Sequence, residues 1–242
     1  SSSTLDSINT LYTSSGVSGL GNEAITVSDS GSIAASTLSA IAAVNTSGTI
    51  TATSAATVTG TAAEIIASFG NNTITEASNV AININSGTAS LTQARTIDGY
   101  TTGVVTATIA DTRVSDLVGS SPLLDANSNN AFTVTIGTAD AEITAANLTT
   151  LNGLTSVAIE AGNVTKITGT VAATNTVYAA AGNSEINGLG NEAVVISGES
   201  SNTLSDASTL NTLDGYTTGT VNAGSLTTCL LYTSPSPRDS SK

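Results

Sequence analysis

Short runs in which apolar and polar residues alternate recur along the chain and predict β-strands of roughly five residues. The clearest runs are residues 24–28, 80–84, 132–136 and 193–197. Further β-like runs occupy residues 49–53, 104–108, 157–159 and 220–223. Each alternating run has one apolar face, which indicates a strand with one side buried. The hydrophobic pattern therefore predicts many short strands.

Between the strands, apolar residues three positions apart on an Ala-, Ser- and Thr-rich background predict short helices. These pairs are Leu38/Ile41, Ala94/Ile97, Leu148/Leu151 and Leu210/Leu213. Helix starts are predicted by capping-box spacing or by a capping Asp, at Ser90/Gln93, Thr61/Glu64 and Asp206. An Asp-Gly or Asn-Gly dipeptide follows three of the four pairs and ends those helices, at 98–99, 152–153 and 214–215. We predict a left-handed glycine C-cap there, and a β-hairpin turn is the alternative.

Two hexapeptides occur twice and show that the chain is an array. Asp-Gly-Tyr-Thr-Thr-Gly stands at 98–103 and 214–219, and Gly-Leu-Gly-Asn-Glu-Ala stands at 19–24 and 188–193. A period of about 56 residues, split into two half-units of about 27, accounts for both pairs. Residues 115–130 depart from the pattern and predict a longer loop.

Strands and helices this short are marginal alone and bury each other only when stacked. The pattern therefore predicts an α/β solenoid of short parallel strands and short helices over residues 1–228. A mainly-β solenoid or an array of sandwiches is the alternative. Tyr12, Phe69 and Tyr178 occupy equivalent positions and predict an interior aromatic ladder, while Tyr100 and Tyr216 form a second equivalent pair.

The end of the chain differs from the array. Residues 229–239 hold the only Cys and two of the three Pro. This string resembles the translation of a transposase adapter used in sequencing libraries. Residues 229–242 are therefore expected to be a non-native tail, and the array is expected to be a fragment of a longer protein.

Composition narrows the class of partners. The chain has a net charge of −13, only 10% charged residues and no His, Met or Trp. An acidic surface without a Lys/Arg cluster repels phosphate, which argues against nucleic acid as a partner. No apolar run approaches the ~20 residues of a membrane span. A long, acidic, Thr-rich array whose only Cys lies in the tail suits a bacterial extracellular protein.

The repeated motifs, together with Thr-Gly-Thr-Ala-Ala-Glu-Ile at 59–65, resemble repeats of very large cell-surface proteins of marine cyanobacteria. Some members of that family are associated with swimming motility. The resemblance covers residues 5–228. It implies a structural segment of a stalk, surface layer or adhesin, located outside the cell or on its surface. Its expected partners are the neighbouring repeats and, as a further class, cell-surface glycans.

No residue is predicted to be catalytic, cofactor-binding or metal-binding, and the chain is not expected to be an enzyme. Without His, a nucleophile lacks its usual base. The recurrence of Asp98 and Asp214 favours a structural role, because an active site is needed once.

Three binding hypotheses stay as alternatives. Calcium would use Asp29, Asp98, Asp111 and Asp206, which are scattered and lack a calcium-loop spacing. Ice would need a flat threonine array, whereas the Thr-x-Thr pairs such as Thr49/Thr51 and Thr73/Thr75 do not recur at one position per repeat. Glycans would need Tyr100 and Tyr216 to form an exposed platform.

Overall fold

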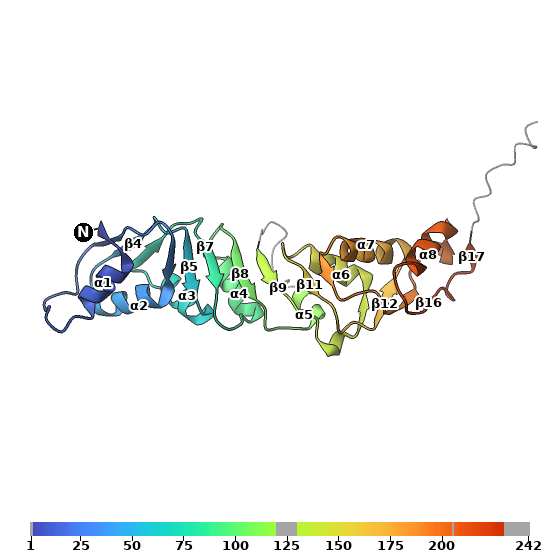
Figure 1. Cartoon of the computed structure of the whole chain (residues 1–242), viewed down its shortest axis with the longest axis horizontal. Helices are drawn as coiled ribbons and strands as arrows, with labels where there is room; N and C mark the ends of the chain where they lie inside the picture. Colours follow the sequence, from blue (N-terminus) through green and yellow to red (C-terminus); the bar gives the residue numbers. More distant parts are fainter. Residues whose placement is uncertain (1, 120–129, 205, 230–242) are drawn as a thin grey trace, which may run out of the picture. The chain divides into compact units, whose positions relative to one another are not determined.

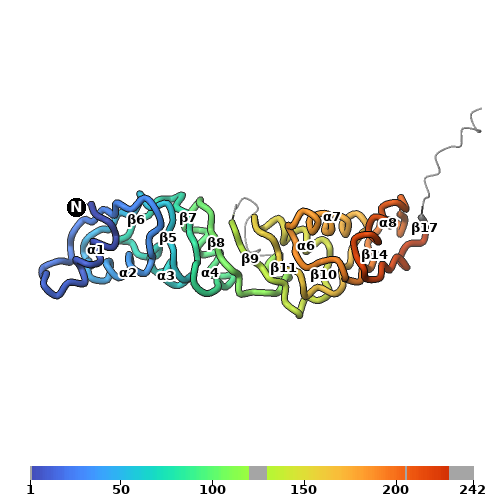
Figure 2. The backbone as a smooth tube through the Cα atoms, viewed as in Figure 1, coloured from blue at the N-terminus to red at the C-terminus, as the bar shows by residue number. Residues whose placement is uncertain are grey.

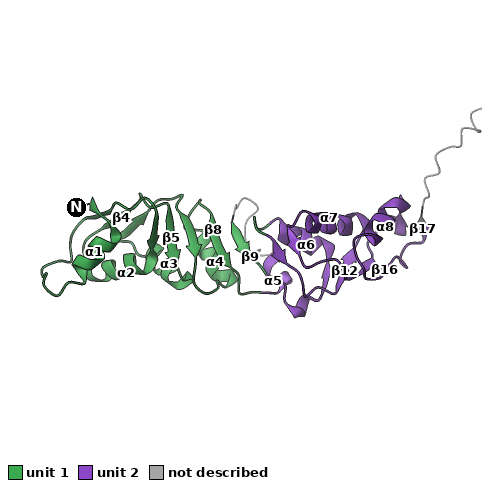
Figure 3. Ribbon diagram, viewed as in Figure 1, with its two compact units in different colours: residues 1–111, 121–134, 154–157 green, residues 112–120, 135–153, 158–242 purple. Residues whose placement is uncertain are grey.

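The computed structural model describes residues 2–119, 130–204 and 206–229, and it has a mixed α/β fold (Figure 1). This confirms the α/β class. All of the described strand pairs are parallel. The chain divides into two compact units (Figure 3). Unit 1 comprises residues 1–111, 121–134 and 154–157, and unit 2 comprises residues 112–120, 135–153 and 158–242.

The described residues of unit 1 form two parallel sheets and four helices. One sheet has the order β1-β2-β4-β6 and the other β3-β5-β7-β8-β9. The strands are β1 (Ser2–Ser3), β2 (Ile25–Val27), β3 (Ser32–Ala34), β4 (Ile50–Ala52), β5 (Thr57–Gly60), β6 (Ile74–Glu76), β7 (Ala81–Ile84), β8 (Val105–Thr108) and β9 (Ala131–Thr133). The helices are α1 (Leu5–Tyr12), α2 (Ala35–Val44), α3 (Ala62–Phe69) and α4 (Leu91–Asp98), and consecutive helices contact each other.

Unit 2 repeats this arrangement with a four-stranded sheet, β10-β12-β14-β16, and two short pairs, β11-β13 and β15-β17. The strands are β10 (Glu142–Thr144), β11 (Ile159–Glu160), β12 (Lys166–Gly169), β13 (Ile186–Asn187), β14 (Ala193–Ile196), β15 (Thr203–Leu204), β16 (Val221–Asn222) and β17 (Thr228–Cys229). The helices are α5 (Val114–Val118), α6 (Ala145–Asn152), α7 (Val171–Gly182) and α8 (Ala207–Asp214), with 3-10 turns at Thr138–Asp140 and Ser200–Asn202.

We call each helix together with the short strands that precede it a module. A strand pairs with the corresponding strand of the next module, as Ile82 does with Val105 and Ile159 with Ile186. Within each unit, successive modules therefore lie side by side (Figure 2). The step from one paired strand to the next ranges from 23 residues (Ile82 to Val105) to 27 residues (Ile159 to Ile186), at or slightly below the predicted half-unit of about 27.

In-register apolar residues form the core. Ile25, Ile50 and Ile74 pair across β2, β4 and β6, and all three are buried. In unit 2, Ile143, Ile167 and Val194 do the same across β10, β12 and β14. The predicted helix pairs supply buried residues too, including Leu38, Ile41, Leu148 and Leu151. Each module thus buries its apolar side chains in a row that continues into the next.

The helix boundaries match most of the predicted signals. Thr61/Glu64 and Ser90/Gln93 form capping boxes, and Asp206 caps α8. Three helices end at Asp98, Asn152 and Asp214 as predicted, and no hairpin turn follows.

The predicted left-handed C-caps are wrong. Gly99, Gly153 and Gly215 have φ of −68°, −73° and −71°, which is right-handed. Each glycine N–H donates to the carbonyl four residues earlier, so the glycine extends the last helical turn instead of reversing it.

Two other predicted segments are only partly described. The predicted loop at 115–130 overlaps α5 at its start, and residues 120–129 lie outside the described residues. Of the predicted tail at 229–242, Cys229 ends β17, and residues 230–242 lie outside the described residues.

Candidate functional site

In unit 2 the two repeated hexapeptides meet at the contact between successive modules, which we call the motif junction (residues 188–193 and 214–219). The Thr217 hydroxyl donates to the Glu192 carbonyl at 2.7 Å and accepts from the Gly219 N–H at 3.0 Å. The Thr218 N–H donates to the Gly190 carbonyl at 2.9 Å. The threonines of the motif therefore bind one module to the preceding one.

Unit 1 contains the same contacts with different acceptors. The Thr101 hydroxyl donates to the Val80 carbonyl at 2.6 Å and accepts from the Gly103 N–H at 2.9 Å. The last glycine of each motif, Gly103 or Gly219, lies so close to the preceding module that a Cβ atom would collide with backbone atoms. This close approach explains the glycine at that position.

The glutamate of the other hexapeptide is held by a tyrosine of the preceding helix, and we call each such pair a clasp (Tyr12/Glu23 and Tyr178/Glu192). The Tyr178 hydroxyl donates to the Glu192 carboxylate at 3.0 Å, and Tyr12 donates to Glu23 at 2.7 Å. The N–H two residues before each glutamate donates to the same carboxylate. Glu192 is 0% exposed, so these donors replace the water that a carboxylate requires.

The clasps shift the pKa values of Glu23, Tyr12 and Tyr178. The Gly21 N–H and then the Tyr12 hydroxyl stabilise the charged carboxylate and lower the pKa of Glu23. Burial, reinforced by Glu23, raises the pKa of Tyr12 to about 12. Burial also raises the pKa of Tyr178, with Glu192 as the next cause.

Four carboxylates cap the first N–H group of a helix in the preceding module. Asp29 accepts from Leu5 at 2.7 Å and Asp111 from Leu91 at 2.6 Å. The other two bonds are Val114 N–H to Asp140 at 2.8 Å and Val171 N–H to Glu199 at 2.6 Å. A carboxylate at a helix N-terminus satisfies an unpaired donor and complements the helix dipole.

These contacts account for the four calcium candidates. Asp29 and Asp111 are the caps just described, Asp206 accepts from Ser208 in its own helix, and Asp98 accepts from the Asn130 amide. Within residues 2–119, 130–204 and 206–229, no group of three or more His, Cys, Asp or Glu side chains is placed to hold a metal ion.

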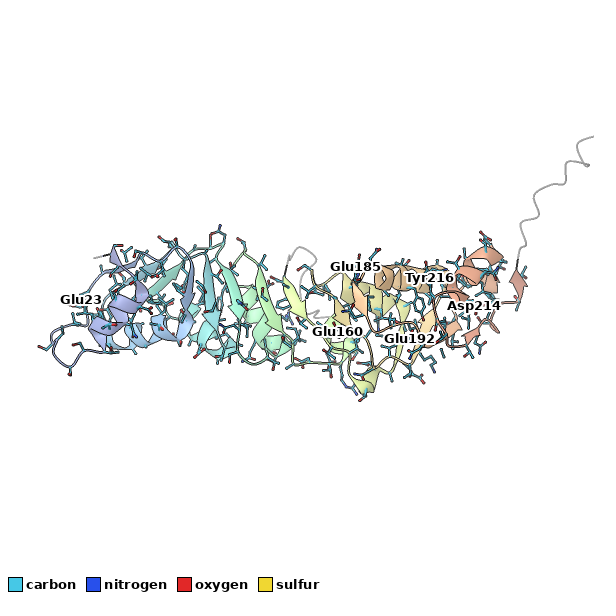
Figure 4. All side chains as sticks on the ribbon, viewed as in Figure 1. Glu23, Glu160, Glu185, Glu192, Asp214 and Tyr216 are labelled. Atoms are coloured by element: carbon cyan, nitrogen blue, oxygen red, sulfur yellow. The ribbon has the colours of Figure 1, made fainter. Side chains whose placement is uncertain are left out.

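The aromatic residues stack in pairs rather than in the predicted ladder. Among the described residues the stacked pairs are Phe69 with Tyr100, at 5.3 Å between centroids, and Tyr178 with Tyr216, at 5.7 Å. Tyr100 thus packs on an aromatic residue of α3, and Tyr216 packs on an aromatic residue of α7. Tyr100 is half-buried, whereas Tyr216 is 43% exposed (Figure 4 labels Tyr216). The two motif tyrosines therefore do not share an exposed position.

One sheet of unit 1 presents hydroxyl groups in register. Ser2, Thr26, Thr51 and Thr75 pair across β1, β2, β4 and β6. Neighbouring strands lie about 4.8 Å apart, so the row has a regular spacing. The feature that recurs in this sheet is a single hydroxyl residue in each strand, whereas the sequence-based expectation concerned Thr-x-Thr pairs. Alignment at the full period concealed the row, because the paired strands are one half-unit apart.

Two shallow grooves in unit 2 have volumes of about 230 and 260 Å³. Polar lining residues of the first include Asn152, Asn183 and Glu185, and those of the second include Asp140 and Glu142. Asp140 is already engaged as a helix cap, and Glu142 forms an ion pair with Lys166.

The clasps and the caps between modules were missed from the sequence. The one available signal for the clasps was that Tyr12 and Tyr178, in aligned segments, each precede a Gly-Leu-Gly-Asn-Glu-Ala hexapeptide. The caps offered no signal in the sequence. The number of residues between a capping carboxylate and the N–H group that it caps varies from 20 to 28, so no fixed spacing marks these pairs.

Comparison with protein-family models, curated protein sequences and solved structures finds no match. In the described part of the chain, no helix has the length and apolar character needed to cross a bilayer.

Substituting Thr217 with Val should lower the free energy of unfolding by about 1–3 kcal/mol, because the Glu192 carbonyl and the Gly219 N–H lose their partner without a change in side-chain shape. The matched control is Thr218→Val, whose exposed side chain should contribute less than about 0.5 kcal/mol. Urea unfolding followed by circular dichroism measures both. Equal losses in the two variants would contradict the role of Thr217.

The clasp at Glu23 predicts a pH dependence of stability. Because the pKa of Glu23 is lowered in the folded state, its contribution is present above its ordinary value of 4.5 and is lost as the pH falls through the folded value. The urea midpoint of the natural chain should therefore fall more steeply below pH 4.5 than that of Glu23→Gln. The same slope in both proteins would show that Glu23 does not contribute.

Proposed function

We propose that this chain is a structural segment of a large extracellular or cell-surface protein, built as an α/β solenoid without catalytic activity. The observation that carries this proposal is the use of the motif side chains. The threonines, glycines and glutamates of the two hexapeptides are occupied in contacts between modules. Contacts repeated from module to module make the array long and rigid, which a stalk, surface layer or adhesin requires.

The charge of the chain supports the same proposal. Most of the capping and clasp carboxylates bind N–H and hydroxyl groups of the neighbouring module, so the array needs few cations. The remaining acidic surface keeps adjacent copies apart and favours solubility. A stalk exposed to the medium benefits from both properties.

Deleting residues 25–49 tests the solenoid. In a solenoid this removes one whole module, and Ile50 takes the place of its partner Ile25. We expect the shortened chain to keep its helix content per residue and a cooperative thermal transition, both measured by circular dichroism. Deleting residues 38–49 breaks the register and serves as the control, which should lose the transition. Loss of folding in both deletions would contradict the proposal.

The in-register hydroxyl row favours a second candidate function, which is binding of ice by one face of the array. Thr26 and Thr75 are exposed and Thr51 is half-buried between them, while their neighbours along each strand, such as Ile25 and Ile50, point into the core. Hydroxyls at a regular strand spacing can order water in a repeating pattern. Ice binding would be a property of this face of the array, whether or not the chain is part of a stalk, surface layer or adhesin.

Ice binding predicts that the natural chain slows ice growth and that Thr51→Tyr abolishes most of the effect, since a bulky ring interrupts the row. Thr96→Tyr, on the exposed face of α4, is the matched control and should retain the effect. Thermal hysteresis and the shape of single ice crystals are the measurements. A natural chain that leaves ice growth unchanged would exclude this function.

A further inference from the structure

Asn187 and Gly188 form an Asn-Gly sequence at the edge of the motif junction. Asn187 is the last residue of β13, and both residues are exposed. Gly188 has a φ of +85°, so the chain leaves the strand immediately after Asn187. The peptide N–H of Gly188 therefore lies outside the strand, on an exposed residue.

The chain contains a second Asn-Gly sequence in a different backbone setting. Asn152 ends α6, and the Gly153 N–H donates to the carbonyls of Thr149 and Thr150 at 3.2 and 3.1 Å. Both asparagine side chains have the same kind of partner, since Asn152 donates to Glu185 and Asn187 to Glu160, each at 2.8 Å (Figure 4 labels both glutamates). The two sites thus differ mainly in how the following N–H is held.

We infer that Asn187 is a site of spontaneous deamidation in the folded protein, and that Asn152 is protected. Hydroxide removes the proton from the Gly188 nitrogen, which attacks the Asn187 side-chain carbonyl carbon. A new C–N bond closes a succinimide ring, and the side-chain nitrogen leaves as ammonia after taking a proton from water. Water then opens the ring at either carbonyl and yields aspartate or isoaspartate. The step requires only water and hydroxide.

The product disturbs the contact between two modules. Asn187 pairs with Glu160 across β11 and β13, and its carbonyl accepts from the Ala161 N–H at 2.8 Å. An aspartate places a second carboxylate beside Glu160, and like charges facing each other across paired strands are destabilising. An isoaspartate lengthens the main chain by one methylene and displaces the carbonyl that binds Ala161. Deamidation therefore loosens the contact between β11 and β13 as the protein ages.

The first copy of the motif supplies a natural control. Its corresponding dipeptide is Ser18-Gly19, and Gly19 has a φ of +83°, almost the same as Gly188. The backbone geometry therefore accepts serine, which cannot form a succinimide by loss of ammonia. Asn187→Ser is accordingly a conservative variant in which the reaction is blocked.

The test is to incubate the purified full chain at mildly alkaline pH and to follow both asparagines by peptide mass mapping, with the urea-unfolded chain as reference. We expect Asn187 to convert in the folded chain, at least about tenfold faster than Asn152, because the Gly153 N–H must first be released from the helix end. In urea the two sites should convert at similar rates. Retention of the Asn187 amide in the folded chain, or equal folded rates at both sites, would overturn the inference.

The consequence is tested separately from the reaction. Asn187→Asp should melt about 2–4 °C below Asn187→Ser, since both lose the amide donor but only the aspartate adds a charge beside Glu160. Adding Glu160→Gln to Asn187→Asp should remove that difference. Equal melting of the two single variants would show that the contact between β11 and β13 tolerates the charge.

Discussion

Parallel pairing between successive modules is the interaction on which the rest of this structure depends. The short strands, such as β2, and the short helices, such as α1 and α3, do not persist alone in water. Each strand is stabilised because its partner follows one module later in the chain with the same alternation of buried and exposed residues. The helices then pack on one another as a consequence of that register. A module has little stability of its own and depends on its neighbours.

Contacts between neighbouring modules also explain how a chain with a net charge of −13 can fold with few Lys and Arg residues. Several of its carboxylates are placed where unpaired backbone donors occur, at helix N-termini and in the clasps. Asp29 and Glu199 cap helices of the preceding module, while Glu192 lies fully buried among a tyrosine hydroxyl and an N–H group. The negative charge of these carboxylates is stabilised by dipoles rather than by Lys or Arg.

The recurring threonines and glutamates described above serve contacts between modules. Outward features of the described residues include the hydroxyl row of β1, β2, β4 and β6, the exposed ring of Tyr216 and the Asn-Gly sequence after β13. The pairing of β11 with β13 and the Glu199 cap on α7 join the same two modules, so loosening one of these contacts weakens the other.

The sequence by itself located some of the strands and helices and indicated the approximate length of the module, but it did not predict strands such as β3, β5 and β12. Alternation at 24–28 and 193–197 located β2 and β14, and capping patterns at Thr61 and Ser90 located two helix starts, because both signals are local. Only the tertiary structure decided which residues meet across modules. The register of the parallel strands aligns Thr26 with Thr51 and Thr75, brings Asp111 to the start of α4 and sets Tyr178 against Glu192. The separations within these pairs vary with the length of each loop and helix, so no fixed spacing in the sequence could reveal them.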